Sequence, residues 1–197
     1  MKGRLLIAGV LAGLLAFFWG FVSHELIGLG ESSMKGIPNE PAVLTALSDN
    51  IKESGFYFFP GAGMMDPNNG TKEQKEAAMK KWDEDFKKYP SGILVVKQPT
   101  GDSLPFTKLL LRQLLADILG GLIAALLLSL AVPSLPSFTG RVLFVATLGL
   151  FASLAIDVPY WNWYGFPTRY LLSALVDSVV GWGLAGILLA VLIRPRL

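Results

Sequence analysis

The sequence predicts a mainly α-helical membrane protein: a four-transmembrane-helix bundle with a small α/β extracytoplasmic domain inserted between helices 1 and 2. Its 197 residues are 52% hydrophobic and only 16% charged, whereas soluble domains usually carry about 25% charged residues. Four apolar runs are long enough to cross a bilayer, and one long polar stretch follows the first of them. The predicted boundaries are 1–29 for transmembrane helix 1, 30–105 for the extracytoplasmic domain and 106–197 for helices 2 to 4.

The first apolar run follows two basic residues and extends from Leu5 to Val22 without a charge. A signal peptide begins in the same way, but no small-x-small cleavage motif precedes the polar sequence, so we expect an uncleaved span. Small residues recur along it at every fourth position, and such rows allow a neighbouring helix to approach closely. They are Ala8, Ala12, Ala16 and Gly20, beside Gly9 and Gly13.

The other three apolar runs are 106–132, 138–156 and 168–193. Prolines interrupt helices, and they mark the two connections between these runs. The first connection holds Pro133 and Pro136, and Pro159 and Pro167 bracket the second.

Basic residues near the ends of the spans predict the orientation, because they gather on the cytoplasmic side. The sequence therefore favours a multi-pass membrane protein with both termini in the cytoplasm. The expected cytoplasmic residues are Lys2, Arg4, Arg141, Arg194 and Arg196, whereas the short outer connection holds only Arg169.

The extracytoplasmic segment 30–105 is patterned as helix, strand, helix, strand. A helix is expected from an Asn39 cap to about Gly55, and the aromatic run 56–59 predicts a strand. Thr71 and Gln74 have the spacing of a capping box, which predicts a helix to about Tyr89. The run 92–96 predicts the second strand.

The second of these helices has one apolar face, formed by Met79, Trp82, Phe86 and Tyr89, and we expect that face to be buried. Its many charges of both signs are typical of a solvated face. Because a two-stranded sheet is marginal in water, we expect the domain to dock on the outer mouth of the bundle or on a partner subunit.

Three short motifs carry a resemblance: Trp19-Gly20 with Ser23-His24, Pro38-Asn39-Glu40, and the run 57–61. In these motifs the chain resembles small four-span bacterial inner-membrane proteins that are described only as hypothetical. The resemblance covers the first span and the outer domain. It implies a bacterial source, the same topology and a periplasmic domain, and it implies no catalytic residue.

Two aspartates fall near the middle of their spans. Counted from Thr107 and Thr168, Asp117 and Asp177 lie roughly 14–15 Å deep at the rise of an α-helix. A carboxylate at that depth costs about 2.5–3.5 kcal/mol on insertion scales, so both are functional candidates together with Arg112 and Gln113. Two interpretations stay open: interhelical hydrogen bonding between neutral side chains, or a ligand or proton site.

A polar rim is expected at the outer ends of the spans, from Ser23, His24, Glu25, Asp157 and Arg169. A hydrogen-bonded interface explains these residues, and a titrating or ligand-binding role for the histidine is the alternative. A lone histidine in a chain without cysteine lacks partners for a metal site, so neither a metal nor a cofactor is predicted.

Aromatic residues gather at the same expected level. Trp19, Trp161, Trp163 and Tyr164 are typical of an interfacial belt, and an apolar cleft for a lipid or quinone is the alternative.

The sequence favours an accessory or structural subunit that docks on a partner membrane complex. The alternatives are a small oligomeric proton- or solute-coupled transporter that uses the midplane aspartates, and a lipid- or quinone-linked membrane enzyme. An enzyme is the less favoured class, because no triad, phosphate loop or paired-histidine motif is present. Expected partners are membrane lipids and other membrane subunits or further copies of the chain. Nucleic acid is not expected, since the net charge is only +2.

Overall fold

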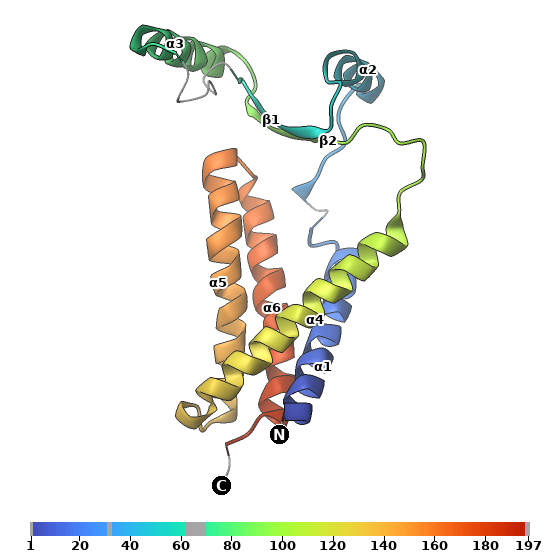
Figure 1. The fold of residues 1–197 in the computed structure, drawn as a ribbon, viewed down its shortest axis with the longest axis vertical. Coiled ribbons are helices and arrows are strands. Elements are labelled where there is room, and N and C mark those ends of the chain that lie inside the picture. The colour runs from blue at the N-terminus through green and yellow to red at the C-terminus, as the bar shows by residue number, and fades with distance from the viewer. Residues whose placement is uncertain (1, 31–32, 62–69, 196–197) are drawn as a thin grey trace. The chain divides into compact units, whose positions relative to one another are not determined.

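The computed structural model describes residues 2–30, 33–61 and 70–195. The chain divides into two compact units, a helical unit of Met1–Met34 with Ser103–Leu197 and an α/β unit of Lys35–Asp102 (Figure 1). Each unit is described by itself.

The helical unit is built from four long helices. They are α1 (Lys2–Phe21), α4 (Phe106–Ala131), α5 (Phe138–Tyr164) and α6 (Thr168–Leu192). A π-helical turn, Val22–Leu26, extends α1, and a 3₁₀ turn, Val132–Ser134, follows α4. Among the described residues, these four helices are long and apolar enough to span a membrane, which confirms the prediction of a multi-pass membrane class.

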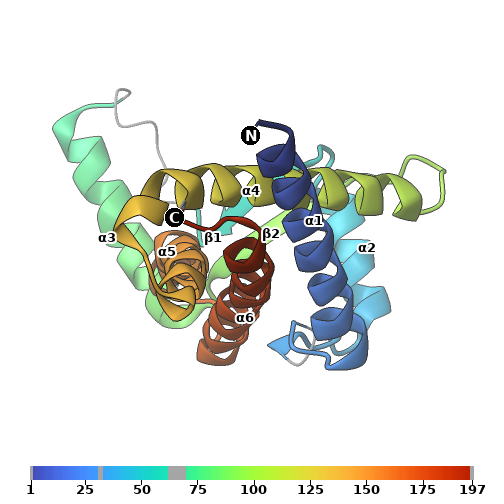
Figure 2. The ribbon, with the colours of Figure 1, turned by 90° about the horizontal axis from the view of Figure 1, so that it is seen from below.

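The helices pack as two pairs, α1 with α4 and α5 with α6 (Figure 2). The small-residue face predicted on α1 is confirmed: Ala8 and Ala12 are buried, and Gly9 and Gly13 lie directly against the α4 backbone. Gly20 has no neighbour at the place of a Cβ atom, so the close contact ends before it.

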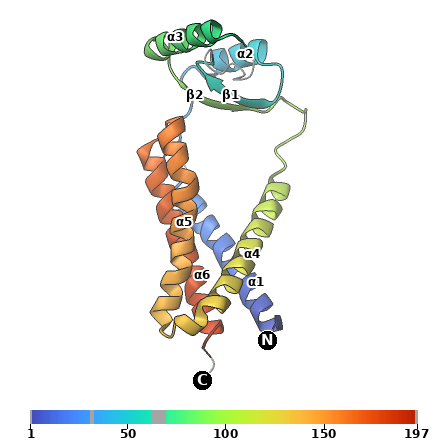
Figure 3. The same ribbon diagram turned by 60° about the vertical axis from the view of Figure 1, so that its left-hand side comes forward.

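The core lies at one end of the helical unit, where the start of α1 and the end of α6 meet the α4–α5 turn. It is made of small and aliphatic side chains, which let the four helices approach closely. Its buried members include Ala124, Ala125, Leu128, Val145, Ala185 and Leu189. Away from this end α4 diverges from α5 and α6, while the far end of α1 approaches α6 (Figure 3).

Arg141 is buried beside this core, with 6% of its surface exposed. Its Nη1 donates to the carbonyl oxygens of Leu135 at 3.2 Å and Pro136 at 2.8 Å, and its Nη2 donates to that of Ala190 at 3.4 Å. The first two carbonyls belong to the α4–α5 turn, and the third belongs to the last turn of α6. Carbonyl groups at these places have no N–H donor within a helix. The sequence identified Arg141 only as a marker of orientation.

The end of α5 differs from the sequence prediction. The third span was expected to stop at Ile156 before a loop, but the helix continues through Pro159 to Tyr164. Proline removes one backbone donor, and transmembrane helices tolerate that loss better than soluble ones. The helix ends at Gly165, which has a φ of 71° and donates its N–H to the Tyr160 carbonyl oxygen, as a left-handed cap does.

The α/β unit has the predicted order of helix, strand, helix, strand. Its elements are α2 (Glu40–Asn50), β1 (Gly55–Phe59), α3 (Lys72–Lys88) and β2 (Gly92–Val96). The strands pair antiparallel, with Gly55 opposite Val96 and Phe59 opposite Gly92.

The structure corrects two predictions about helix α2, one for its end and one for its start. It ends at Asn50 rather than near Gly55, because Gln98 donates to the Ile51 carbonyl oxygen at 2.8 Å and to the Ser54 hydroxyl at 2.9 Å. These bonds hold the chain before β1 against the segment after β2. Asn39 stands at the start of α2 in the left-handed conformation, with a φ of 51°, and its side chain makes no capping hydrogen bond.

The expected buried face of α3 is only partly buried. Met79 is 55% exposed, Phe86 47% and Tyr89 52%. Trp82 is better held, because its Nε1 donates to the Pro60 carbonyl oxygen at 3.0 Å and its ring lies 5.4 Å from that of Phe86. None of the described residues in 35–61 and 70–102 is buried.

The capping box of α3 is confirmed and gives a first testable expectation. Gln74 N–H donates to the Thr71 hydroxyl at 3.3 Å, and Thr71 N–H donates to Gln74 Oε1 at 2.8 Å. Thr71→Ala should destabilise the helix start by about 0.5–2 kcal/mol. Amide hydrogen exchange of the full chain should then be faster in the first turn of α3. Thr45→Ala, inside α2, is the control, and equal acceleration by both changes would contradict the role of the cap.

Acid should weaken the same helix start. The Glu73 carboxylate accepts hydrogen bonds from its own backbone N–H and from the Thr71 hydroxyl. Both bonds lower its pKa below the ordinary value, and the backbone bond has the larger effect. A lowered pKa stabilises the folded form above the unfolded-state pKa, and this stabilisation is lost as the pH falls through the folded-state pKa.

Candidate functional site

A cleft of about 710 Å³ lies between α1 with its π-helical turn, α4 and α6, and we call it the interhelical cleft. Its polar lining comes from all three parts, and its walls are largely aromatic. Its polar lining includes His24, Glu25, Gln113, Asp117 and Asp177. The aromatic residues are Phe17, Phe18, Trp19, Phe21, Phe106 and Trp182.

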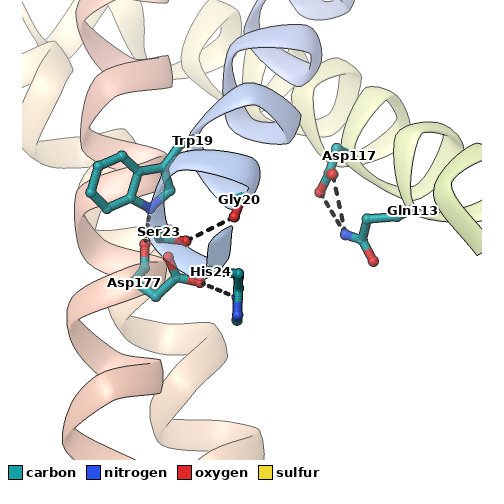
Figure 4. A network of polar contacts seen from close by, with 7 residues as sticks. All are labelled: Trp19, Gly20, Ser23, His24, Gln113, Asp117 and Asp177. Carbon is teal, nitrogen blue, oxygen red and sulfur yellow. Dashed lines mark hydrogen bonds and ion pairs between the residues drawn. The ribbon is translucent and has the colours of Figure 1, made fainter. Parts of the chain in front are cut away.

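The cleft contains a pair between His24 and Asp177, whose Nε2 and Oδ2 atoms are 3.5 Å apart (Figure 4). The sequence placed His24 at the outer rim and Asp177 near the midplane, yet the structure brings them together. Trp19 fixes this approach of α1 to α6, because its Nε1 donates to the Asp177 backbone oxygen at 3.1 Å. The other carboxylate oxygen, Oδ1 of Asp177, is buried and has no hydrogen-bond partner among the described residues.

The π-helical turn positions the histidine. Such turns are rare, occur mostly as single-turn insertions and are frequent at functional sites. Ser23 within it is buried, and its hydroxyl donates to the Gly20 carbonyl oxygen at 3.2 Å. After the turn the chain folds back, so that Gly30 lies against the His24 imidazole. Nothing in the residue pattern of this stretch distinguishes a π turn from an α turn.

Asp117 enters the cleft from α4. Gln113, one turn earlier, donates from Nε2 to both carboxylate oxygens at 3.1 Å (Figure 4). Asp117 and Asp177 thus share one cleft, each with its own polar partner. Arg112, the counter-charge expected from the sequence, is exposed, and none of the ion pairs found among the described residues joins it to Asp117.

The remaining rim candidates lie apart from His24. Asp157 accepts a hydrogen bond from Ser153, at 2.7 Å on the same helix, and Arg169 is exposed at the start of α6. Glu25, in contrast, lines the interhelical cleft beside His24.

The aromatic candidates also divide. Trp19 belongs to the cleft, whereas Trp161, Trp163 and Tyr164 lie in the last turns of α5. Trp161 donates to the Thr168 hydroxyl at 3.2 Å, Trp163 is 75% exposed, and the Tyr164 ring lies 5.8 Å from that of Tyr160.

Trp182 is a cleft residue that the sequence reasoning missed. Its ring occupies the space left by Gly120 of α4 and Gly149 of α5, where a Cβ atom would meet it at 2.6 Å and 2.9 Å. A tryptophan in mid-span, away from the interfacial levels that tryptophans favour, was the available signal.

The cleft is acidic. It contains the carboxyl groups of Glu25, Asp117 and Asp177 and one imidazole, and no lysine or arginine is among the described residues that line it. No group of three or more potential metal-ligating side chains occurs within the described part of the chain.

Four apolar helices with a polar cleft among them define a multi-pass membrane protein. Comparison of the chain with family models, with curated proteins and with solved structures gives no match. The function is therefore inferred from the residues themselves.

Proposed function

We propose that the protein is an accessory subunit that docks on a partner membrane complex through its α/β unit and its helix faces. One observation carries this proposal: no described residue of the α/β unit is buried, although the unit has regular helices and a paired sheet. A two-stranded sheet with so little core is marginal in water, so a covering surface is needed to stabilise it.

Helix α3 supplies the docking face in this proposal. Its exposed apolar side chains, Met79, Phe86 and Tyr89, lie along one side. Other positions carry ion pairs one turn apart, Lys81 with Asp85 and Lys87 with Asp83, so these charges already have partners within the helix. An apolar stripe bordered by charges has the composition of a protein interface, with a hydrophobic centre and a polar rim.

The proposed location is a bacterial inner membrane, with both termini in the cytoplasm and residues 30–105 on the periplasmic side. The start of α1 and the end of α6 lie at the same end of the helical unit, which supports a common side for both termini (Figure 1). The start of α1 contains Lys2 and Arg4, and Arg194 follows the end of α6. Basic residues at that end are what the positive-inside rule expects of a cytoplasmic face.

The docking face is tested by Met79→Glu, with Ala77→Glu as a matched control on the opposite side of α3. The full chain is cross-linked in its native membrane and purified in mild detergent. We expect a stoichiometric membrane polypeptide, and Met79→Glu should reduce its recovery roughly 30-fold, the effect of losing one interface hot spot. Ala77→Glu should leave recovery unchanged.

Two outcomes would remove the accessory role. One is a stable chain that purifies without any stoichiometric polypeptide. The other is an equal response to Met79→Glu and Ala77→Glu, because it would mean that charge alone, and not the apolar face, governs recovery.

The interhelical cleft favours a second candidate, a small proton- or solute-coupled transporter that works as an oligomer. Ionisable side chains inside a membrane are expensive and commonly mark solute or proton pathways. Here Asp117, Asp177 and His24 all line one cleft within the four apolar helices. Such a transporter must first bind its solute there.

A further inference from the structure

We infer that the interhelical cleft binds an amphiphilic organic cation, which is a positively charged centre carried on an apolar body. This inference deepens the second candidate function and rests on it for the biological use of the site. The binding itself is argued from the volume, charge and aromatic walls of the cleft.

The volume and position set the size and the apolar character of the ligand. A cleft of about 710 Å³ falls within the roughly 300–1,000 Å³ of sites that hold drug-sized molecules. All of its lining residues belong to the helices that are apolar enough to span a membrane. A ligand that enters from such surroundings must be largely apolar, because polar molecules are poorly soluble in the bilayer core.

The charges set the sign of the ligand. Three carboxyl groups, from Glu25, Asp117 and Asp177, line the cleft without a lysine or arginine among its described residues. Only part of this charge is compensated inside the protein. His24 faces one oxygen of Asp177, and the neutral amide of Gln113 faces Asp117. A cation would complete the pairing that the protein leaves unfinished.

A buried, unpartnered oxygen points to the same ligand. Oδ1 of Asp177 is shielded from solvent and accepts no hydrogen bond from any described residue. Buried acceptors without a donor are rare in folded proteins, because each costs about 1–3 kcal/mol. An N–H donor or a positive centre in the cleft would satisfy this oxygen.

The aromatic walls suit a cation that is not strongly hydrated. Trp19 and Trp182 both border the cleft, and their rings are held in place by close helix packing. Trp19 lies against Gly181 and bonds the Asp177 backbone, and Trp182 lies between Gly120 and Gly149. Aromatic faces attract organic cations, most strongly where water is excluded.

Two other sources of positive charge fit less well. Inorganic cations make no use of the apolar walls and prefer several oxygen ligands at one point. The ammonium group of a phospholipid is joined to a phosphate, which the three carboxylates would repel. The cleft therefore fits a free amphiphilic cation better than an aminophospholipid, and the binding test distinguishes the two.

The test is equilibrium binding of tetraphenylphosphonium to the purified full chain in a neutral detergent. We expect saturable binding of one probe per chain. Asp177→Asn and Asp117→Asn should each weaken it at least about 10-fold, because each removes a negative charge that attracts the cation where water is largely excluded. Asp157→Asn is the matched control, because Asp157 does not line the cleft and is bonded to Ser153. It should bind the probe as the unchanged chain does.

Tetraphenylborate has the same shape and the opposite charge, so it should not compete. Phosphatidylethanolamine in mixed micelles should not displace the probe. The inference is overturned if no saturable binding occurs. This result would mean either that a second copy of the chain fills the cleft or that the cleft accepts no cation. It is also overturned if the borate competes equally, if the aminophospholipid displaces the probe, or if Asp157→Asn weakens binding as much as Asp177→Asn. Thermal unfolding of each variant confirms that it is folded.

Uptake of the probe into proteoliposomes separates the site from its use. Binding together with uptake driven by a pH gradient supports both the cation site and the transporter. Binding without such uptake supports the cation site and removes the transporter. Tetraphenylphosphonium also crosses a bilayer unaided, so uptake is counted as the excess over protein-free liposomes. Excess uptake that survives in a variant that has lost binding would contradict the cation site.

Discussion

Replacing Gly13 by alanine is expected to separate α1 from α4 and to lower the free energy of unfolding by about 1–3 kcal/mol, the usual cost of overpacking. A Cβ atom at Gly13 would lie 2.5 Å from the Asp117 backbone oxygen and still closer to the Ile118 Cα atom. These are backbone atoms, so no side-chain rotation relieves the contact. Gly121 meets the same limit from the α4 side, where a Cβ atom would lie 2.5 Å from the Gly13 nitrogen.

The same change should also affect the interhelical cleft. The α4 backbone that Gly13 contacts is that of Asp117 itself, so a shift of α4 moves this carboxyl group away from Asp177. We expect Gly13→Ala to weaken tetraphenylphosphonium binding even at temperatures where the variant remains folded.

Gly20→Ala is the control in the same helix, because nothing lies within 4 Å of the added Cβ atom. Alanine is favoured over glycine in a helix by up to about 1 kcal/mol, so this variant should be as stable as the unchanged chain or slightly more stable. Denaturant unfolding in detergent micelles, followed by circular dichroism, measures both. Equal stabilities for Gly13→Ala and Gly20→Ala would show that α1 and α4 do not meet at Gly13.

Arg141→Ala should have a comparable or larger effect on stability. The guanidinium group satisfies three carbonyl groups that would otherwise lack donors, and it is almost fully buried. Each hydrogen bond to a charged group contributes about 1.5–3 kcal/mol to stability. Loss of the shortest one, to the Pro136 carbonyl oxygen, should by itself lower the free energy of unfolding by that amount. Arg141→Lys should be intermediate, because an ammonium group reaches fewer of these oxygens at once.

Arg194→Ala separates this role from the removal of a positive charge. Arg194 is exposed at the end of α6 and donates from Nε to the Val191 carbonyl oxygen at 2.8 Å within its own helix end. Its replacement should change the unfolding midpoint little. If both alanine variants lower the midpoint equally, then charge and not the buried network stabilises this end of the helical unit.

Features with a local cause were predicted well from the sequence. The four spans follow from the length and composition of their apolar runs. The capping box of Thr71 and Gln74 and the two strands follow from short residue patterns. Each of these needs only neighbours along the chain, and the structure confirms them.

Features that depend on distant residues were not predictable in this way. The early end of α2 is caused by Gln98, which is far away in the sequence. At Pro159 the general rule that proline ends a helix gave the wrong boundary, and Gly165 was the effective stop.

The candidate site shows the same division. Asp117, Asp177 and His24 were identified because ionisable residues are rare in apolar runs. Their meeting in one cleft depends on how α1 crosses α4 and on the π-helical turn after Phe21. The small-residue row of α1 indicates a close contact but neither its partner nor its crossing, and no residue pattern indicates the π-helical turn. Depths counted along straight, upright helices therefore placed His24 and Asp177 at different levels. The contacts of Arg141 likewise depend on distant residues, whereas the mid-span position of Trp182 was a signal in the sequence that was not used.

The pairing of α1 with α4 has a consequence for biosynthesis. These two helices lie side by side, yet the whole α/β unit separates them along the chain. At a synthesis rate of about 5–20 residues per second, α1 leaves the ribosome roughly 4–16 s before the start of α4. During that interval its glycine face has only lipid, or another protein, to contact. The whole α/β unit is thus synthesised before α4, and α5 and α6, which complete the core, follow later still.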